Sequence, residues 1–177
     1  MELSIGQKVA YPNQGVCTVE EVVNKDVCGD CISFYSLRIL NDNSLIFVPV
    51  ENAESVGIRP IISSRQAKRL IQDLKEDFEI ISGDWKIRSR EFTEKLQSGS
   101  VFAAADVLKK LTFLSHEKKL SFREQTLLEK AKFLIVSEIA TADLLEADTL
   151  APQIAQLVEA ACTKHLGTQP KVMAVSI

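Results

Sequence analysis

Residues 33–50, SFYSLRILNDNSLIFVPV, decide how the first part of this chain folds. Two short runs rich in β-branched and aromatic residues, 33–40 and 44–50, flank the segment NDNS, whose residues favour tight turns. This pattern predicts two adjacent strands joined by a short loop. Pro49 stands inside the second run, and proline cannot donate a hydrogen bond to a neighbouring strand. We therefore expect an edge strand or a bulge there.

The strand pattern extends back to the N-terminus. QKVAYP (7–12) and GVCTVEEVV (15–23) alternate between apolar and polar residues, and PNQG and CGD supply turn signals. Four or five short strands with tight turns predict a small SH3/Tudor-like β-barrel or a strongly bent sheet over residues 1–62.

From about residue 63 the apolar period becomes helical. The expected N-caps are Ser63 or Ser64, Asp84, Ser100, Ser121 in a capping box with Glu124, and Thr149. These signals predict an all-α domain of about five helices over residues 63–166, with Gly167 ending the last helix. Residues 167–177 show no clear period and are expected to form a tail, partly ordered or disordered. The fold class is therefore predicted to be α+β.

Composition excludes several function classes. The chain has 177 residues, 46% of them hydrophobic, and no apolar run approaches the ~20 residues of a membrane span. No N-terminal segment has the pattern of a signal peptide. We also find no phosphate-binding glycine loop and no nucleophile–base motif. We expect a cytoplasmic, monomeric protein that does not contact membranes, has no catalytic residues and needs no cofactor.

Charge is unevenly distributed along the chain. Residues 1–60 hold 4 Lys and Arg against 8 Asp and Glu, whereas residues 61–125 hold 13 against 10. A protein that binds nucleic acid by itself usually has a stronger basic excess. Any nucleic-acid contact is therefore local, or it depends on a partner that brings the chain to the nucleic acid.

Residues 83–92, GDWKIRSREF, place the one tryptophan of the chain, Trp85, at the head of a basic run. The cations of this run are Lys86, Arg88 and Arg90. One interpretation is that Trp85 begins a buried helical stripe with Phe92 and Leu96. The other is an aromatic tip flanked by cations, which suits a duplex groove. Two details support the second interpretation: Arg88 lies on the side of the helix where the first would place a core residue, and Trp85 stands in the first turn. The residues alone leave both interpretations open.

The four cysteines are too few and too scattered for a disulfide framework. Cys28 and Cys31 form a CxxC motif, but a zinc site would need about two further ligands. His116 and His165 belong to the helical region. We therefore interpret Cys28 and Cys31 as residues of a hairpin turn and predict no metal site.

Both halves of the chain resemble the CarD/CdnL family of bacterial RNA polymerase-binding proteins, over about residues 3–145. In the first half the matching residues are Gly6, Val9, Tyr11, Pro12, Gly15, Tyr35, Leu37, VPVENA (48–53) and VGIR (56–59). In the second half they are Trp85, Arg88, Arg90, EKLQSG (94–99), DVLKKL (106–111), LSFRE (120–124) and LLEKAKFLIVSEIA (127–140). Transcription-repair coupling factors carry a module related to the first half alone.

The resemblance implies a Tudor-like domain that docks on the β1 lobe of the RNA polymerase β subunit. It also implies a helical domain that contacts promoter DNA at the upstream edge of the melted bubble. There a tryptophan inserts into the minor groove and stabilises the open complex without strong sequence specificity. By motif, Trp85 matches this wedge, and Arg88 and Arg90 match cations that contact DNA; Lys86 lies in the same run. The polymerase contacts are expected at Lys25, Phe47, Val48 and Pro49.

Two positions depart from the family pattern. Ile87 stands where many relatives carry a third cation, and Phe47 stands where some relatives carry arginine. One phosphate contact is therefore expected to be missing, and the polymerase contact is expected to be apolar. The alternative function is an interaction adaptor of the same architecture that does not bind DNA and keeps Trp85 in its core. The solvent exposure of Trp85 separates the two functions.

Overall fold

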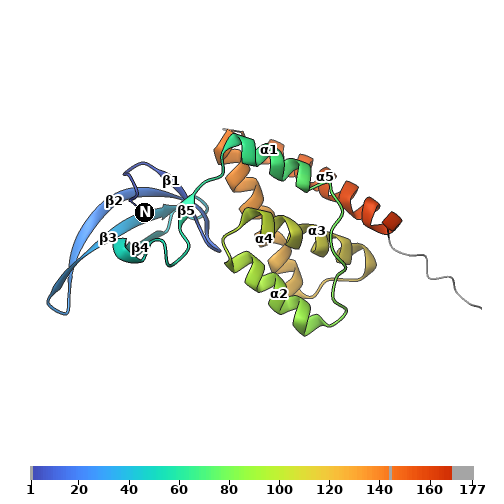
Figure 1. The fold of residues 1–177 in the computed structure, drawn as a ribbon, viewed down its shortest axis with the longest axis horizontal. Helices are drawn as coiled ribbons and strands as arrows, with labels where there is room; N and C mark the ends of the chain where they lie inside the picture. Colours follow the sequence, from blue (N-terminus) through green and yellow to red (C-terminus); the bar gives the residue numbers. More distant parts are fainter. Residues whose placement is uncertain (1, 144, 169–177) are drawn as a thin grey trace, which may run out of the picture.

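The computed structural model describes residues 2–143 and 145–168 of the chain. A five-stranded antiparallel sheet comes first and five helices follow, as Figure 1 shows. The predicted α+β class, with a bent sheet followed by an all-α region, is confirmed. No helix in the described ranges is long and apolar enough to cross a membrane.

The sheet has the order β4-β3-β2-β1-β5. Its strands are β1 (Lys8–Tyr11), β2 (Gly15–Val27), β3 (Asp30–Ile39), β4 (Leu45–Pro49) and β5 (Arg59–Pro60), with the short 3-10 helix η1 (Val50–Asn52) between the last two. β2 and β3 form a hairpin that is longer than predicted and extends away from the helices in Figure 1. The predicted edge position of the strand that contains Pro49 is confirmed, since β4 lies at one end of the sheet.

Two consecutive residues with positive φ make the turn of this hairpin. Cys28 has φ 56° and Gly29 has φ 93°, while Val27 pairs with Asp30 across the turn. The Gly29 N–H donates a hydrogen bond to the Asp26 carboxylate at 3.0 Å. Two positive φ values are typical of the type I′ turns that match the twist of paired strands. The predicted hairpin turn is confirmed for Cys28, whereas Cys31 lies in β3, where it pairs with Asp26.

The helices are α1 (Ser64–Asp73), α2 (Trp85–Gln97), α3 (Val101–Glu117), α4 (Phe122–Asp143) and α5 (Ala147–Thr168). The predicted caps Ser63, Asp84 and Ser100 each accept a hydrogen bond from a first-turn N–H. The capping box before α4 is also present: the Ser121 N–H donates to the Glu124 carboxylate at 2.9 Å, and the Glu124 N–H donates to the Ser121 hydroxyl at 3.3 Å. Local sequence therefore determines where the first four helices begin.

The predicted start and end of the last helix are wrong. α5 begins at Ala147, because the carbonyl of Glu146 accepts the first helical hydrogen bonds and the Thr149 hydroxyl donates to the same carbonyl. Thr149 therefore lies inside the first turn and not at the cap. Gly167 is part of α5, which continues to Thr168. Of the predicted tail, residues 169–177 lie outside the described residues.

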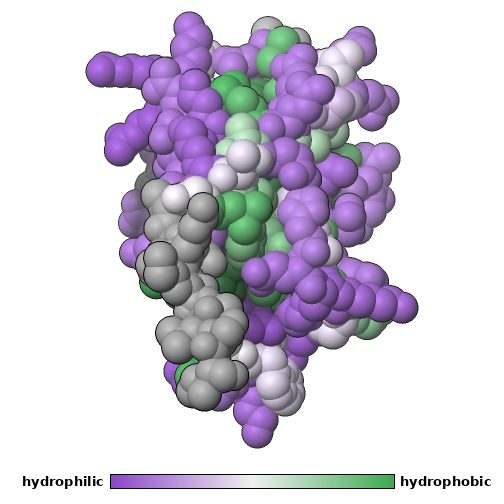
Figure 2. All heavy atoms as spheres, turned by 90° about the vertical axis from the view of Figure 1, so that its right-hand side faces the viewer, coloured by the Kyte–Doolittle hydropathy of each residue, from purple (hydrophilic) through white to green (hydrophobic). Residues whose placement is uncertain are grey.

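Each part of the chain has its own buried cluster. The sheet encloses Val9, Val19, Tyr35, Leu37 and Val48, among others. The helices enclose Leu70, Phe92, Leu111, Ile135 and Ile154, among others. Figure 2 views the helical end and shows hydrophilic residues over most of this face, with hydrophobic residues in a strip between them. Burial of these apolar side chains is the main force that holds the helices together.

The two parts meet where β5 leads into α1. The Arg59 guanidinium donates to the Glu138 carboxylate of α4 at 2.9 Å and to the Gly99 carbonyl at 2.8 Å. The same carboxylate accepts the Ile62 N–H at 3.0 Å. Gly99 has φ 76°, and a Cβ there would lie 3.1 Å from a ring carbon of Pro12. Glycine at position 99 therefore ends α2 and also allows the sheet to approach the helices closely.

We predict that Glu138→Ala destabilises the protein, because it removes the carboxylate partner of the Arg59 guanidinium and the acceptor of the Ile62 N–H. Loss of a buried ion-pair partner costs ~3–5 kcal/mol, and the partly exposed Arg59 reduces this to roughly 2–3 kcal/mol. Urea-induced unfolding followed by circular dichroism measures the change. Glu94→Ala is the control, since Glu94 belongs to an exposed pair worth under ~1 kcal/mol. Equal losses in the two variants would contradict the prediction.

Candidate functional site

Trp85 is the first residue of α2 and its side chain is in solvent. Asp84 caps the helix by accepting the N–H groups of Lys86 and Ile87 at 2.8 and 3.5 Å. Trp85 is 64% exposed. Phe92, two turns further along the helix, is buried. The predicted exposure of Trp85 is confirmed, and the alternative that placed this ring in the core is wrong.

Arg88 occupies the position where the buried stripe of α2 begins. Its side chain is 6% exposed, and it donates to the Ser82 carbonyl at 2.8 Å and to the Glu124 carboxylate at 3.0 Å. The expectation that Arg88 contacts a DNA phosphate is therefore corrected, because its donors are turned inward onto protein acceptors. The role that this geometry supports is to join the first turn of α2 to the first turn of α4.

Glu124 is the acceptor at the centre of this junction. Besides Arg88, it accepts hydrogen bonds from Lys118 at 3.0 Å and from the Ser121 N–H at 2.9 Å. Burial raises the pKa of its carboxyl group, but the hydrogen bonds from Ser121, Lys118 and Arg88 outweigh burial and lower the pKa to about 2. Glu124 is therefore a carboxylate at neutral pH, and two cations compensate its charge.

Two cations of the basic run remain accessible. Lys86 is exposed, and its ammonium lies 5.8 Å from the centre of the Trp85 ring. The side chain of Arg90 is 82% exposed and forms a 2.7 Å ion pair with Glu94, which lies one helical turn away and is also exposed. Such surface pairs contribute little to stability. Arg90 can therefore exchange this partner for another anion at low cost.

A second surface lies on the sheet, on the face opposite its core. Phe47 is 41% exposed, and the Lys25 ammonium lies 3.6 Å from the centre of its ring. The same ammonium lies 5.9 Å from the ring of Phe34, which pairs with Pro49 across β3 and β4. A cation over an aromatic face is attracted by the ring quadrupole. Lys25, Phe47 and Pro49 therefore belong to one accessible surface at the edge of the sheet.

Val48 does not belong to that surface. Its side chain is buried in the sheet cluster with Tyr35 and Leu37. Successive residues of a strand point to opposite faces, so residues 47 and 49 share the outer face and Val48 points inward. The expectation of a polymerase contact through the Val48 side chain is therefore corrected. This alternation was present in the sequence and could have separated Val48 from its neighbours.

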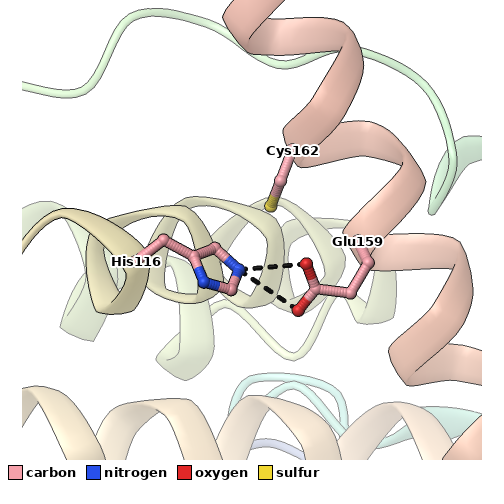
Figure 3. A group of neighbouring side chains, drawn as sticks. All are labelled: His116, Glu159 and Cys162. Atoms are coloured by element: carbon pink, nitrogen blue, oxygen red, sulfur yellow. Dashed lines mark hydrogen bonds and ion pairs between the residues drawn. The ribbon is translucent and has the colours of Figure 1, made fainter.

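Cys28, at the hairpin turn, and Cys31, in β3, are exposed free thiols. Within the described ranges, one other group of side chains has the types and spacing of metal ligands: His116, Glu159 and Cys162, whose ligand atoms lie within 4.8 Å of one another. Figure 3 shows His116 of α3 facing Glu159 of α5. Sequence reasoning missed this group because α3 and α5 are far apart along the chain.

The chemistry of this group favours a hydrogen bond between His116 and Glu159 over a metal centre. The His116 ring nitrogen lies 3.0 Å from the exposed Glu159 carboxylate. Burial and the charge of Glu159 raise the pKa of the Cys162 thiol to about 11, and its sulfur lies 3.9 Å from the Lys109 carbonyl. A metal requires a thiolate, so binding here would work against both effects.

We predict that Arg88→Ala and Arg90→Ala differ sharply in stability, although the two arginines are one residue apart. Arg88→Ala leaves Glu124 with one cation fewer in a buried site and should cost roughly 3 kcal/mol. Arg90→Ala should stay within ~0.5 kcal/mol, as for an ordinary surface change. Thermal melting of both variants beside the parent protein tests this. Similar melting temperatures would show that Arg88 does not join the two helices.

Comparison with known proteins gives consistent relationships for both parts of the chain. Residues 3–62 match the family model of the CarD-like/TRCF RID domain, and residues 69–155 match that of the CarD C-terminal domain. The chain is 24% identical to the putative transcription factor YdeB of Bacillus subtilis. The alignment spans 135 residues and covers 76% of this chain and 88% of that protein.

A solved structure is also related to the first part. This is the solution structure of the 72-residue N-terminal domain of Myxococcus xanthus CarD, which is 36% identical and covers 33% of this chain and 79% of that one, with a TM-score of 0.29. The two matched models together account for most of the chain. It therefore belongs to the CarD/CdnL family of transcription regulators that interact with RNA polymerase.

Proposed function

We propose that this protein docks on the β1 lobe of the RNA polymerase β subunit and stabilises the promoter open complex. Trp85 inserts into the minor groove at the upstream edge of the melted bubble, and Lys86 and Arg90 neutralise nearby phosphates. The observation that supports this most directly is the accessible indole at the start of α2. The fold does not bury its one tryptophan, and two accessible cations, Lys86 and Arg90, stand in the same run.

Docking on polymerase compensates for the weak intrinsic affinity of this chain for DNA. The chain carries a formal net charge of −3, so it has little general attraction for DNA. A tether to polymerase makes the second contact intramolecular, and its effective concentration then replaces intrinsic affinity. The proposed DNA contact can therefore be weak by itself and still act wherever polymerase has opened a promoter. The protein acts as a monomer in this scheme.

The docking surface that we propose consists of Lys25, Phe47 and Pro49. β4 is an edge strand, so its outer side also offers backbone groups that a strand of the polymerase lobe can pair with. The ring of Phe47 supplies an apolar anchor, and Lys25 holds that ring in place from the face of the sheet. Val48 contributes to this surface through its backbone alone.

We predict that Phe47→Ala weakens binding to the isolated β1 lobe by ~1–3 kcal/mol, the usual effect of removing an apolar anchor at an interface. The fold should persist because Phe47 is half exposed at a sheet edge. Isothermal calorimetry measures binding, and a thermal melt checks the fold. Val56→Ala removes a comparably exposed apolar side chain outside the strands and is the control. Unchanged affinity of a stable Phe47→Ala variant would remove Phe47 from the docking surface.

We predict that Trp85→Ala shortens the lifetime of promoter open complexes while leaving lobe binding intact. The free energy of unfolding should change by less than ~1 kcal/mol, whereas truncation of a buried tryptophan costs ~3–5 kcal/mol. Leu166→Ala is the matched control, because Leu166 is 63% exposed on a different helix. An open-complex lifetime that Trp85→Ala leaves unchanged would contradict the proposed wedge.

The two kinds of contact should respond differently to promoter sequence. Arg90→Ala removes about one phosphate neutralisation, so it should reduce the salt slope of DNA binding by about 1 on every promoter. The effect of Trp85→Ala should vary with the base step at the upstream edge, because the cost of unstacking varies with sequence. Open-complex lifetimes on two promoters that differ at this step, measured at several salt concentrations, separate the two contributions.

A further inference from the structure

Phe122 occupies the same position in α4 that Trp85 occupies in α2. It is the first residue of its helix, directly after the capping residue Ser121, and its side chain is 85% exposed. No other large hydrophobic residue among those that the structure describes is more exposed. Singly exposed apolar residues are common on protein surfaces, so a contact can be inferred only from what surrounds this ring.

The two helix starts are held against each other. Arg88, three residues after Trp85, donates to the Glu124 carboxylate, which is two residues after Phe122. That carboxylate also accepts the N–H of Ser121, so hydrogen bonds position the residues on both sides of Phe122. The buried ion pair therefore sets the spacing between the segments that carry the two exposed aromatic residues.

A hollow of about 340 Å³ lies between these segments. It is lined by Trp85, Ser89, Lys118, Ser121, Arg123 and Glu124. Trp85 thus shares one concave surface with both sequence neighbours of Phe122. We call the hollow together with Phe122 the α2–α4 edge.

The accessible charge of the α2–α4 edge is mostly positive. Lys119 is exposed, and Arg123 has only a 3.5 Å contact with the Thr93 hydroxyl. Lys118 remains half exposed while it contacts Glu124. Two carboxylates of this edge already have partners: Glu124 is buried among cations, and Asp84 accepts backbone N–H groups. Glu117 is exposed at the end of α3. An accessible cation excess around two aromatic residues complements a polyanion that also offers apolar surfaces.

We propose that Phe122 is a second aromatic contact to promoter DNA, made on the same duplex as Trp85, with Arg123 and Lys119 contacting phosphates. This rests on the proposed function of Trp85. DNA combines phosphates with stacked bases and sugars, so one ligand satisfies both the cations and the rings. The Arg88–Glu124 pair fixes the spacing of the two aromatic residues, which contact a deformed duplex at two points.

The test uses the full-length protein with RNA polymerase on a promoter. Phe122→Ala should shorten the open-complex lifetime by roughly fivefold or more, as expected for loss of one aromatic contact with nucleic acid. Binding to the β1 lobe and the melting temperature should not change. Leu166→Ala serves again as the exposed apolar control. Arg123→Ala should reduce the salt slope of DNA binding by about 1.

Failure of this inference differs from failure of the proposed function. If Trp85→Ala shortens the lifetime and Phe122→Ala does not, Phe122 is not a DNA contact and the proposed function stands. If neither variant shortens it, the proposed function fails as well. Phe122→p-benzoylphenylalanine identifies the occupant: photocrosslinks to promoter DNA support the inference, and crosslinks to a polymerase subunit alone would overturn it.

Discussion

The carboxylate of Glu138 is the point on which the arrangement of the two parts depends. It is buried in α4, yet it accepts hydrogen bonds from Arg59 at the end of the sheet and from the Ile62 N–H just before the first helix. The Arg59 guanidinium also reaches the Gly99 carbonyl, so one ion pair connects the sheet, α4 and the end of α2. If the protein bridges polymerase and DNA, these contacts set the direction in which α2 extends from the docking surface.

Several cations of the helical part are buried, so its excess of Lys and Arg overstates the positive charge at its surface. Arg88, Lys109 and Lys110 are almost fully buried. Lys109 of α3 donates to the Asp73 carbonyl at the end of α1 at 2.9 Å, and Lys110 of α3 forms a 3.3 Å ion pair with Glu91 of α2. These cations hold helices together and are not available to DNA. The cations that remain accessible near Trp85 are therefore a smaller and more local set than a count of charges along the sequence indicates.

Sequence alone predicted the features that depend on neighbouring residues. The caps of the first four helices and the hairpin turn at Cys28 follow from a few adjacent side chains, and each was correct. The residues alone left the exposure of Trp85 open, and the resemblance to a family decided that prediction. The burial of Arg88 could not be predicted in this way, because its partner Glu124 is 36 positions away. The basic run favoured an interpretation in which every cation faces outward, and tertiary packing decided otherwise.

The positions of Val48 and Phe122 are two further cases. The inward side chain of Val48 follows from strand alternation, a pattern that was used to find the strands but not to sort their residues. Phe122, like Trp85, follows a capping residue as the first residue of its helix. The start of a helix does not by itself decide exposure, because Val101 follows the cap Ser100 in α3 and is buried, whereas Trp85 and Phe122 are exposed. Tertiary packing around each first turn makes this difference, and the sequence does not show it.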